Sequence, residues 1–181
     1  MIDRHLSTQF DAELSGISSR VLEMGGLVES QVAKAITSMT TFDGDLAAEV
    51  LREEVQVNRL EIEIDRDLSG IIALRQPTAR DLRLLIAVSR ITANLERVGD
   101  EAARTARVVQ RLLAAGSPTR PRLPVSDLQF ESDMAIELLR KALDSFARLD
   151  TAAALEVIKQ DRQIDSEFEG LLRKLITYMM E

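Results

Sequence analysis

Apolar residues recur at spacings of three and four along almost the whole of this 181-residue chain, which is the periodicity of amphipathic helices. Glycine and proline, the residues that interrupt helices, number only eight and four. We therefore expect an all-α protein. The pattern predicts helices over 17–42, 45–74, 79–113, 126–149 and 151–181.

Stop and start signals separate these helices. Pro77 should end the second helix just before it, because the residue preceding a proline disfavours helical geometry. Thr78 and Asp81 have the spacing of a capping box, in which the hydroxyl accepts from the first free N–H groups of the third helix. Three of the four prolines lie between residues 114 and 126, which predicts a connection there.

The third helix has the most regular apolar seam. Its residues alternate spacings of four and three: Leu84, Val88, Ile91, Leu95, Val98, Ala102, Thr105, Val109 and Leu112. Such a seam suits long, nearly antiparallel helix packing.

The chain also repeats itself at an offset of 107 residues, without a gap, through two helices and the turn between them. The offset pairs Lys34 with Lys141, Ser38 with Ser145, Asp43 with Asp150 and Gln56 with Gln163. It would place the counterpart of helix 79–113 at 186–220, and the chain ends at Glu181. We predict two tandem three-helix-bundle repeats with pseudo-twofold symmetry, the second lacking its last helix. The domains are then 1–116, a proline-rich linker at 117–125, and 126–181.

Composition excludes several classes of function. The chain has no cysteine and one histidine, so thiolate metal sites, Glu-x-x-His di-iron sites and Ser-His-Asp catalysis are all disfavoured. We predict that it is not an enzyme. A net charge of −7 and an aromatic content of 3% argue against nucleic-acid binding. The absence of a long apolar stretch or a signal peptide predicts a soluble, cytoplasmic protein.

Carboxylates form stripes on the second and third helices. Glu96 and Asp100 are i,i+4 neighbours and project from one face. Oxygen-only stripes suit hard or borderline cations such as Mg²⁺, Mn²⁺, Ca²⁺ or iron, although such acids can equally form a solvated charged face. The candidate metal ligands are Glu54, Asn58, Glu61, Glu96, Asp100, Asp161 and Asp165.

Arginines recur every seven residues on the third helix, from Arg83 to Arg111. One interpretation is a solvent-facing stripe whose members pair with Asp100 and Glu101. The other is a surface that binds a partner protein. Its candidate residues are Arg83, Arg90, Arg97 and Arg104.

Several segments of the chain resemble the PhoU family. They are His5 with Gln9-Phe10, Met24-Gly25-Gly26, Arg75-Gln76-Pro77-Thr78-Ala79, Leu95-Glu96-Arg97-Val98-Gly99-Asp100 and Thr177-Tyr178-Met179-Met180-Glu181. The resemblance covers essentially the whole chain and implies two three-helix bundles, in agreement with the internal repeat.

The resemblance also implies a function. Members of this family are adaptors that link the phosphate ABC transporter to the sensor histidine kinase PhoR, and they repress both phosphate-starvation signalling and phosphate uptake. The implied protein is a cytoplasmic homodimer, peripheral to the inner membrane, that reaches the membrane only through its protein partners.

A divalent metal or an iron cluster is the cofactor that the resemblance implies. The family's Glu/Asp-x-x-x-Asp motif corresponds here to Glu96–Asp100 and Asp161–Asp165, and in the motif that begins at Glu54 the second acid is replaced by Asn58. A metal-storing or metal-sensing helical protein is therefore the alternative function. A purely structural bundle is a third.

Overall fold

The computed structural model describes residues 2–116 and 124–180, with side chains from residue 9 onward except that of Tyr178. All regular secondary structure in these ranges is helical, which confirms the predicted class. The helices are α1 (Ile2–Thr41), α2 (Gly44–Arg75), α3 (Ala79–Ala114), α4 (Val125–Arg148) and α5 (Thr151–Met180). Residues 117–123 of the predicted linker lie outside the described residues.

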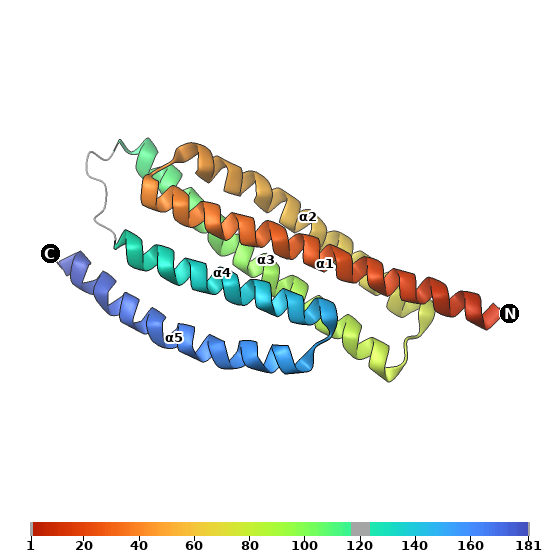
Figure 1. The fold of residues 1–181 in the computed structure, drawn as a ribbon. Helices are drawn as coiled ribbons and strands as arrows, with labels where there is room; N and C mark the ends of the chain where they lie inside the picture. Colours follow the sequence, from red (N-terminus) through yellow and green to blue (C-terminus); the bar gives the residue numbers. More distant parts are fainter. Residues whose placement is uncertain (1, 117–123, 181) are drawn as a thin grey trace.

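The first three helices form a bundle in which each contacts the other two (Figure 1). α4 packs on α1, and α5 packs on α4. The second unit is therefore a two-helix hairpin that joins the first bundle through the contact between α1 and α4.

The ends of the helices follow local chemistry. The Asp43 carboxylate caps α2 by accepting from the Asp45 and Leu46 N–H groups at 2.9 and 3.0 Å. α2 ends at Arg75, as expected just ahead of Pro77. Gln76 takes a left-handed conformation with φ of 46°, and not the extended one that usually precedes a proline. The capping-box prediction is wrong in one respect: the Thr78 hydroxyl donates to Asp81 Oδ2 at 2.7 Å and makes no cap to the backbone.

Two other expectations need correction. α1 begins at Ile2 and not near residue 17, because Phe10 and Leu14 continue its apolar face and pack against the core. The predicted seam of α3 is too narrow: Val98 is 38% exposed, whereas Thr92 and Ala103 are buried. α3 lies against both α1 and α2, so it buries a wider face than a two-helix seam would.

A buried polar layer divides the core of the first bundle. One apolar cluster includes Val28, Val57 and Leu95, and the other includes Ala35, Val50 and Ala102. Between them each helix contributes one buried residue that is not apolar. These residues are Gln31 of α1, Glu54 of α2 and Gly99 of α3.

The structure repeats at the offset found in the sequence. The Asp43 N–H donates to the Ser38 carbonyl at 3.0 Å, and the Asp150 N–H donates to the Ser145 carbonyl at 2.9 Å. The ion pair between Arg20 and Asp67 has its counterpart in Lys174 and Asp127, with the charges exchanged between the two helices. These equivalent contacts show that α1–α2 and α4–α5 are the same structural unit.

The second unit has no counterpart of α3 in the described part of the chain, as predicted. Along α4 and α5 runs an open groove lined by Ala135, Leu138, Leu139, Ala142, Val157, Ile158, Asp161 and Ile164. Three of these residues correspond by the offset to Gln31, Glu54 and Val57, which lie against Gly99 of α3 in the first bundle. The groove is thus the position that α3 fills in the first repeat.

Candidate functional site

The candidate site lies where α2 meets α3, beside the buried polar layer. The Gln31 amide donates from Nε2 to Glu54 Oε2 at 3.2 Å and to the Val50 carbonyl at 3.3 Å. Gln31 is completely buried and Glu54 is 6% exposed. A carboxylate this deep in a helical bundle requires polar neighbours, and Gln31 is one of them.

Gly99 allows α3 to approach this layer closely. A Cβ at position 99 would lie 2.9 Å from Gln31 Oε1, 3.4 Å from Val57 Cγ1 and 3.6 Å from Glu54 Oε2. Only a glycine fits this spacing without displacing its neighbours. The Leu-Glu-Arg-x-Gly-Asp segment thus has its glycine at the point of closest approach and its carboxylates on either side.

The carboxylates of the two helices come together at this site. Burial raises the pKa of Glu54, and a hydrogen bond and charge repulsion from Asp100 raise it further. Burial also raises the pKa of Glu61, with Glu96 as the next contributor. Of the predicted ligands, the structure therefore brings together Glu54, Glu61, Glu96 and Asp100.

Glu96 belongs to the same electrostatic group. Burial raises its pKa first, the Asp100 carboxylate raises it further, and the Arg97 guanidinium opposes the shift. The carboxylates of the cluster repel one another, because several of them lie in a partly desolvated region with few hydrogen-bond donors.

Two amide oxygens next to the carboxylates lack hydrogen-bond donors. Gln31 Oε1 and Asn58 Oδ1 are both buried and unpaired among the described residues. Buried acceptors without a donor are uncommon in native proteins. In this place they add two neutral oxygens to a region already rich in carboxylates. Within the described ranges, however, no group of three or more Asp, Glu or His side chains is arranged to hold a metal ion.

Asp161 and Asp165 lie elsewhere. Both are exposed on α5, away from the cluster between α2 and α3. Asp161 lines the open groove, whereas its counterpart Glu54 is buried beneath α3. The two repeats therefore present equivalent acids in different surroundings.

The arginine stripe faces outward from α3. Arg83, Arg90, Arg97 and Arg104 are exposed. Of these, only Arg104 forms an ion pair with a carboxylate that the structure describes, at 2.9 Å from Glu101. The expected pairing with neighbouring acids is thus limited to one arginine of the four.

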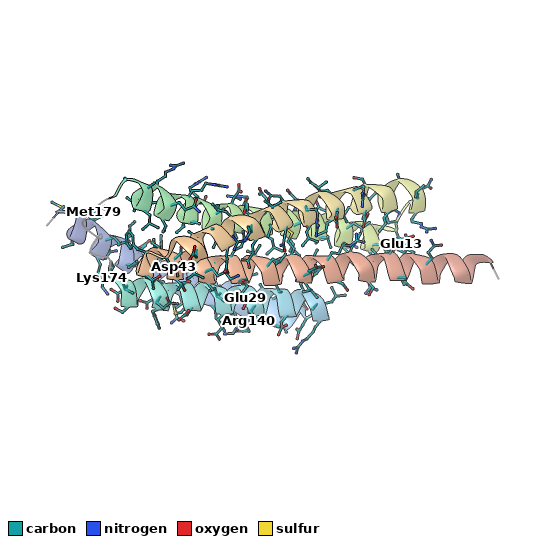
Figure 2. All side chains as sticks on the ribbon, turned by 90° about the horizontal axis from the view of Figure 1, so that it is seen from above. Glu13, Glu29, Asp43, Arg140, Lys174 and Met179 are labelled. Atoms are coloured by element: carbon teal, nitrogen blue, oxygen red, sulfur yellow. The ribbon has the colours of Figure 1, made fainter. Side chains whose placement is uncertain are left out.

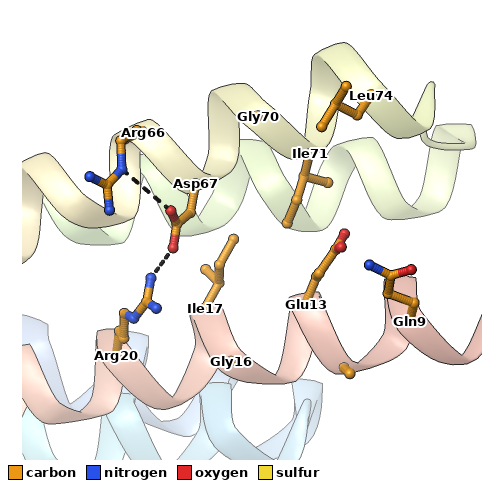
Figure 3. Close-up of a pocket in the computed structure, with 11 residues that line it drawn as sticks. Gln9, Glu13, Gly16, Ile17, Arg20, Arg66, Asp67, Gly70, Ile71 and Leu74 are labelled. Atoms are coloured by element: carbon orange, nitrogen blue, oxygen red, sulfur yellow. Dashed lines mark hydrogen bonds and ion pairs between the residues drawn. The ribbon is translucent and has the colours of Figure 1, made fainter.

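A hollow of about 520 Å³ lies between α1 and α2 (Figure 3), and no sequence pattern predicted it. It required tertiary structure, since its two sides come from distant parts of the chain. Asp67 accepts from Arg20, and Arg66 Nε lies 3.7 Å from Asp67 (Figure 3). The Arg75 guanidinium donates to both oxygens of Glu13, at 2.6 and 3.1 Å. Each of these two carboxylates is paired with at least one guanidinium group, so we assign the charges to helix packing and not to a ligand.

Among the described residues, none of the helices combines the length and the apolar character that crossing a membrane requires.

Comparisons with known proteins identify what the chain is similar to. The model of the PhoU domain matches residues 21–109 and 130–181, one match in each structural repeat. A phosphate-specific transport system accessory protein PhoU homolog from Burkholderia sp is 48% identical, with 100% of this chain and 77% of the relative covered. The accessory protein PhoU of Escherichia coli (strain K12) is 43% identical, with 99% and 73% covered.

Solved structures agree. The crystal structure of PhoU from Pseudomonas aeruginosa superposes with a TM-score of 0.84 at 40% identity, covering 94% of this chain and 80% of that one. The phosphate transport system regulatory protein PhoU from Streptococcus pneumoniae gives 0.83 at 25% identity, with 94% and 79% covered. Matches that run through both repeats, in sequence and in fold, show that this chain belongs to the PhoU family.

Proposed function

We propose that this chain is an accessory protein of phosphate transport that represses phosphate-starvation signalling and limits phosphate uptake. In this role it acts as an adaptor between the phosphate ABC transporter and the sensor histidine kinase PhoR. The observation that carries the proposal is the match over the whole chain to relatives named phosphate-specific transport system accessory proteins. The role is regulatory and involves no catalysis.

The proposed protein works in the cytoplasm as a homodimer and reaches the inner membrane through its partners. The long helices support an adaptor, because they present extended surfaces. Among the helices that the structure describes, α3 contacts only α1 and α2, and α5 contacts only α4. Sedimentation of the purified chain at several concentrations tests the homodimer, and a single monomeric species would contradict it.

The adaptor proposal is tested in a bacterial strain that lacks its own PhoU-family protein. Expression of this chain should silence a phosphate-starvation reporter in phosphate-rich medium. Purified chain should capture the cytoplasmic part of the kinase and the ATPase subunit of the transporter. Continued reporter expression with normal levels of this chain, together with failure of both captures, would overturn the proposal.

We infer, as a second candidate, that the acidic cluster binds a divalent metal or an iron cluster. The supporting observation is the pair of unpartnered amide oxygens, Gln31 Oε1 and Asn58 Oδ1, beside the carboxylates of Glu54 and Asp100. Oxygen donors of this kind suit hard cations. A bound cation would supply the positive charge that the cluster lacks, although the side chains would have to rotate to surround it.

Metal analysis and thermal unfolding test this second candidate. Mn²⁺ or Fe²⁺ should raise the melting temperature of the wild-type chain, and Glu96→Ala/Asp100→Ala should abolish the increase. Asp161→Ala/Asp165→Ala is the matched control, because it removes two acids of the same spacing from an exposed face. An equal response of both double variants to metal would contradict the assignment to α2 and α3.

A further inference from the structure

The outward face of α3 is basic, although the protein as a whole carries a net charge of −7. The exposed arginines of this helix are Arg80, Arg83, Arg90, Arg97, Arg104, Arg107 and Arg111. The only exposed acid on it is Glu101. No other helix of the described chain packs on this face, since α3 contacts only α1 and α2.

Arginines on α3 differ from those elsewhere in the described chain. Away from α3, most form ion pairs: Arg20, Arg59, Arg66, Arg75, Arg140, Arg148 and Arg173. Figure 2 shows one of these pairs, Arg140 with Glu29, between α4 and α1. On α3 only Arg104 has such a partner among the described carboxylates. Most arginines of this face therefore have no ion pair in the described chain, although the Arg97 guanidinium also acts electrostatically on the Glu96 carboxylate.

The sequence explains why Arg83 and Arg90 stay unpaired. Carboxylates three or four residues away are the natural partners of an arginine on a helix surface. Around Arg83 and Arg90 those positions hold Ala79, Arg80, Ile86, Ala87, Ala93 and Asn94. The helix itself thus offers no acid to either arginine.

The surface between the arginines is formed by small side chains and is partly apolar. Ala87 and Ala93 are exposed, and Ile86 is 44% exposed. Small side chains allow a second helix to approach at about 8–10 Å between axes. Arginine beside apolar surface is also a common composition at the centre of protein interfaces.

The spacing of the arginines suits a helical partner. Seven residues of α-helix rise by about 10.5 Å, so Arg83, Arg90, Arg97 and Arg104 repeat at that interval. A stripe of this period drifts around a helix by only about 20° per step. A second helix with a carboxylate at every seventh residue, crossing at a shallow angle, can therefore pair with successive guanidinium groups. Arginine favours such pairs because its planar group can donate two parallel hydrogen bonds to one carboxylate.

The neighbouring acids favour a narrow partner over a broad one. Glu61, Glu96 and Asp100 lie together beside the stripe, between α2 and α3. A helix about 10 Å across can lie along the arginines without covering that cluster. A flat anionic bilayer would press phosphates against the carboxylates as well as the arginines, at a cost in repulsion.

We propose that the outward face of α3, centred on Arg83, Arg90 and Arg97, is the docking surface for an acidic α-helix of a partner protein. The proposal rests on the adaptor function above, and it identifies the part of the chain and the chemistry of the partner through which the adaptor acts.

The probe is a 28-residue alanine-rich helical peptide with glutamate at every seventh residue. An isomer of the same composition, with its glutamates distributed around the helix, is the reference. The full chain should bind the first peptide at least ten times more tightly than the isomer. Equal binding of the two peptides would overturn the proposal, because it would reflect charge alone.

Charge reversal locates the binding surface. Arg83→Glu/Arg90→Glu should weaken binding of the first peptide at least tenfold. The matched control is Arg52→Glu/Arg162→Glu, which changes the net charge equally at two exposed arginines without ion pairs in the described chain, and it should stay within twofold of wild type. Equal losses in both variants would overturn the proposal. Circular dichroism checks that both variants are folded. If Arg83→Glu/Arg90→Glu does not fold, Arg83→Ala/Arg90→Ala is measured in its place.

Two further probes test other occupants. Binding of phosphatidylglycerol vesicles or duplex DNA through Arg83 and Arg90, without binding of the peptide, would overturn the proposal in favour of a lipid or nucleic-acid surface. None of these measurements uses the kinase or the transporter. Peptide binding, with continued reporter expression and failed capture of both partners, would support the docking surface and overturn the adaptor function. Silencing of the reporter and capture of both partners without peptide binding would support the adaptor function and overturn the docking surface.

Discussion

Gly99 of α3 lies so close to the side chain of Gln31 in α1 that a Cβ at position 99 would stand 2.9 Å from Gln31 Oε1. This contact brings three helices together at the polar layer that divides the core. The acidic cluster depends on it, because α3 carries Glu96 and Asp100 on either side of the same glycine.

Gly99→Ala should therefore be less stable than Gly26→Ala by about 1–3 kcal/mol, the usual cost of overpacking a core, because the buried Gln31 side chain would have to move from its hydrogen bonds. Gly26→Ala is the control, since position 26 is exposed on α1 and a Cβ there meets nothing within 4 Å. That change should stabilise by up to about 1 kcal/mol through helix propensity. Urea unfolding measures both, and a Gly99→Ala variant as stable as Gly26→Ala would refute the close packing.

The acidic cluster should make the protein more stable as the pH falls from about 7 to about 5. The pKa values of Glu54, Glu61 and Glu96 are raised in the folded state above 4.5. In this range the folded chain therefore binds more protons than the unfolded chain, and protonation favours folding. Unfolding measured across this range with a chelator present checks the sign.

Glu54→Gln should reduce this pH dependence and raise stability near neutral pH, since the amide carries no charge to desolvate. Glu23→Gln, at an exposed position of α1, should leave the pH dependence unchanged. If the Glu54→Gln variant keeps the wild-type slope, the buried carboxylate is not its source.

Two lysine–glutamate pairs of equal length should differ in their contribution to stability. Lys34 Nζ lies 2.6 Å from Glu53 Oε1, with side chains 31% and 16% exposed. Lys159 Nζ lies 2.6 Å from Glu156 Oε1, with side chains 69% and 62% exposed. Lys34→Met should cost about 1–2 kcal/mol, because it leaves Glu53 with a largely buried charge. Lys159→Met should cost no more than about 0.5 kcal/mol, and equal losses in chemical unfolding would contradict this difference.

Gly25 should control how the second unit docks on the first. A Cβ at this position would overlap Leu143 Cδ1 of α4, so Gly25→Ala should weaken the contact between α1 and α4. Hydrogen exchange should then speed up in α4 and α5 more than in α3, with Gly26→Ala as the neighbouring control. Because Leu143→Ala removes the overlap, the double variant should lose less stability than the two single variants predict together. Strict additivity would show that the two residues do not contact each other.

Local features of the chain were readable before the fold was known. The end of α2 before Pro77 depends on backbone geometry, and the helices themselves depend on apolar periodicity; both act over a few residues. The repeat is found by comparing the chain with itself, which needs no structure. The start of α1 and the true core face of α3 were misread, because both are set by packing against other helices. Phe10 and Leu14 belong to the core only because the other helices of the bundle pack against them.

The candidate site also separates what local sequence predicts from what tertiary packing decides. Glu54 and Asp161 occupy equivalent acidic positions of the repeat, although the residue four positions on is Asn58 in the first repeat and Asp165 in the second. Only the tertiary structure decides that Glu54 is buried and repelled by Asp100, because α3 covers it, whereas Asp161 faces an open groove. The sequence by itself determined that the chain is helical, repeated and acidic, with arginine at every seventh position of one helix. Which of those charges are buried together and which remain free for a partner was decided by the way three helices pack.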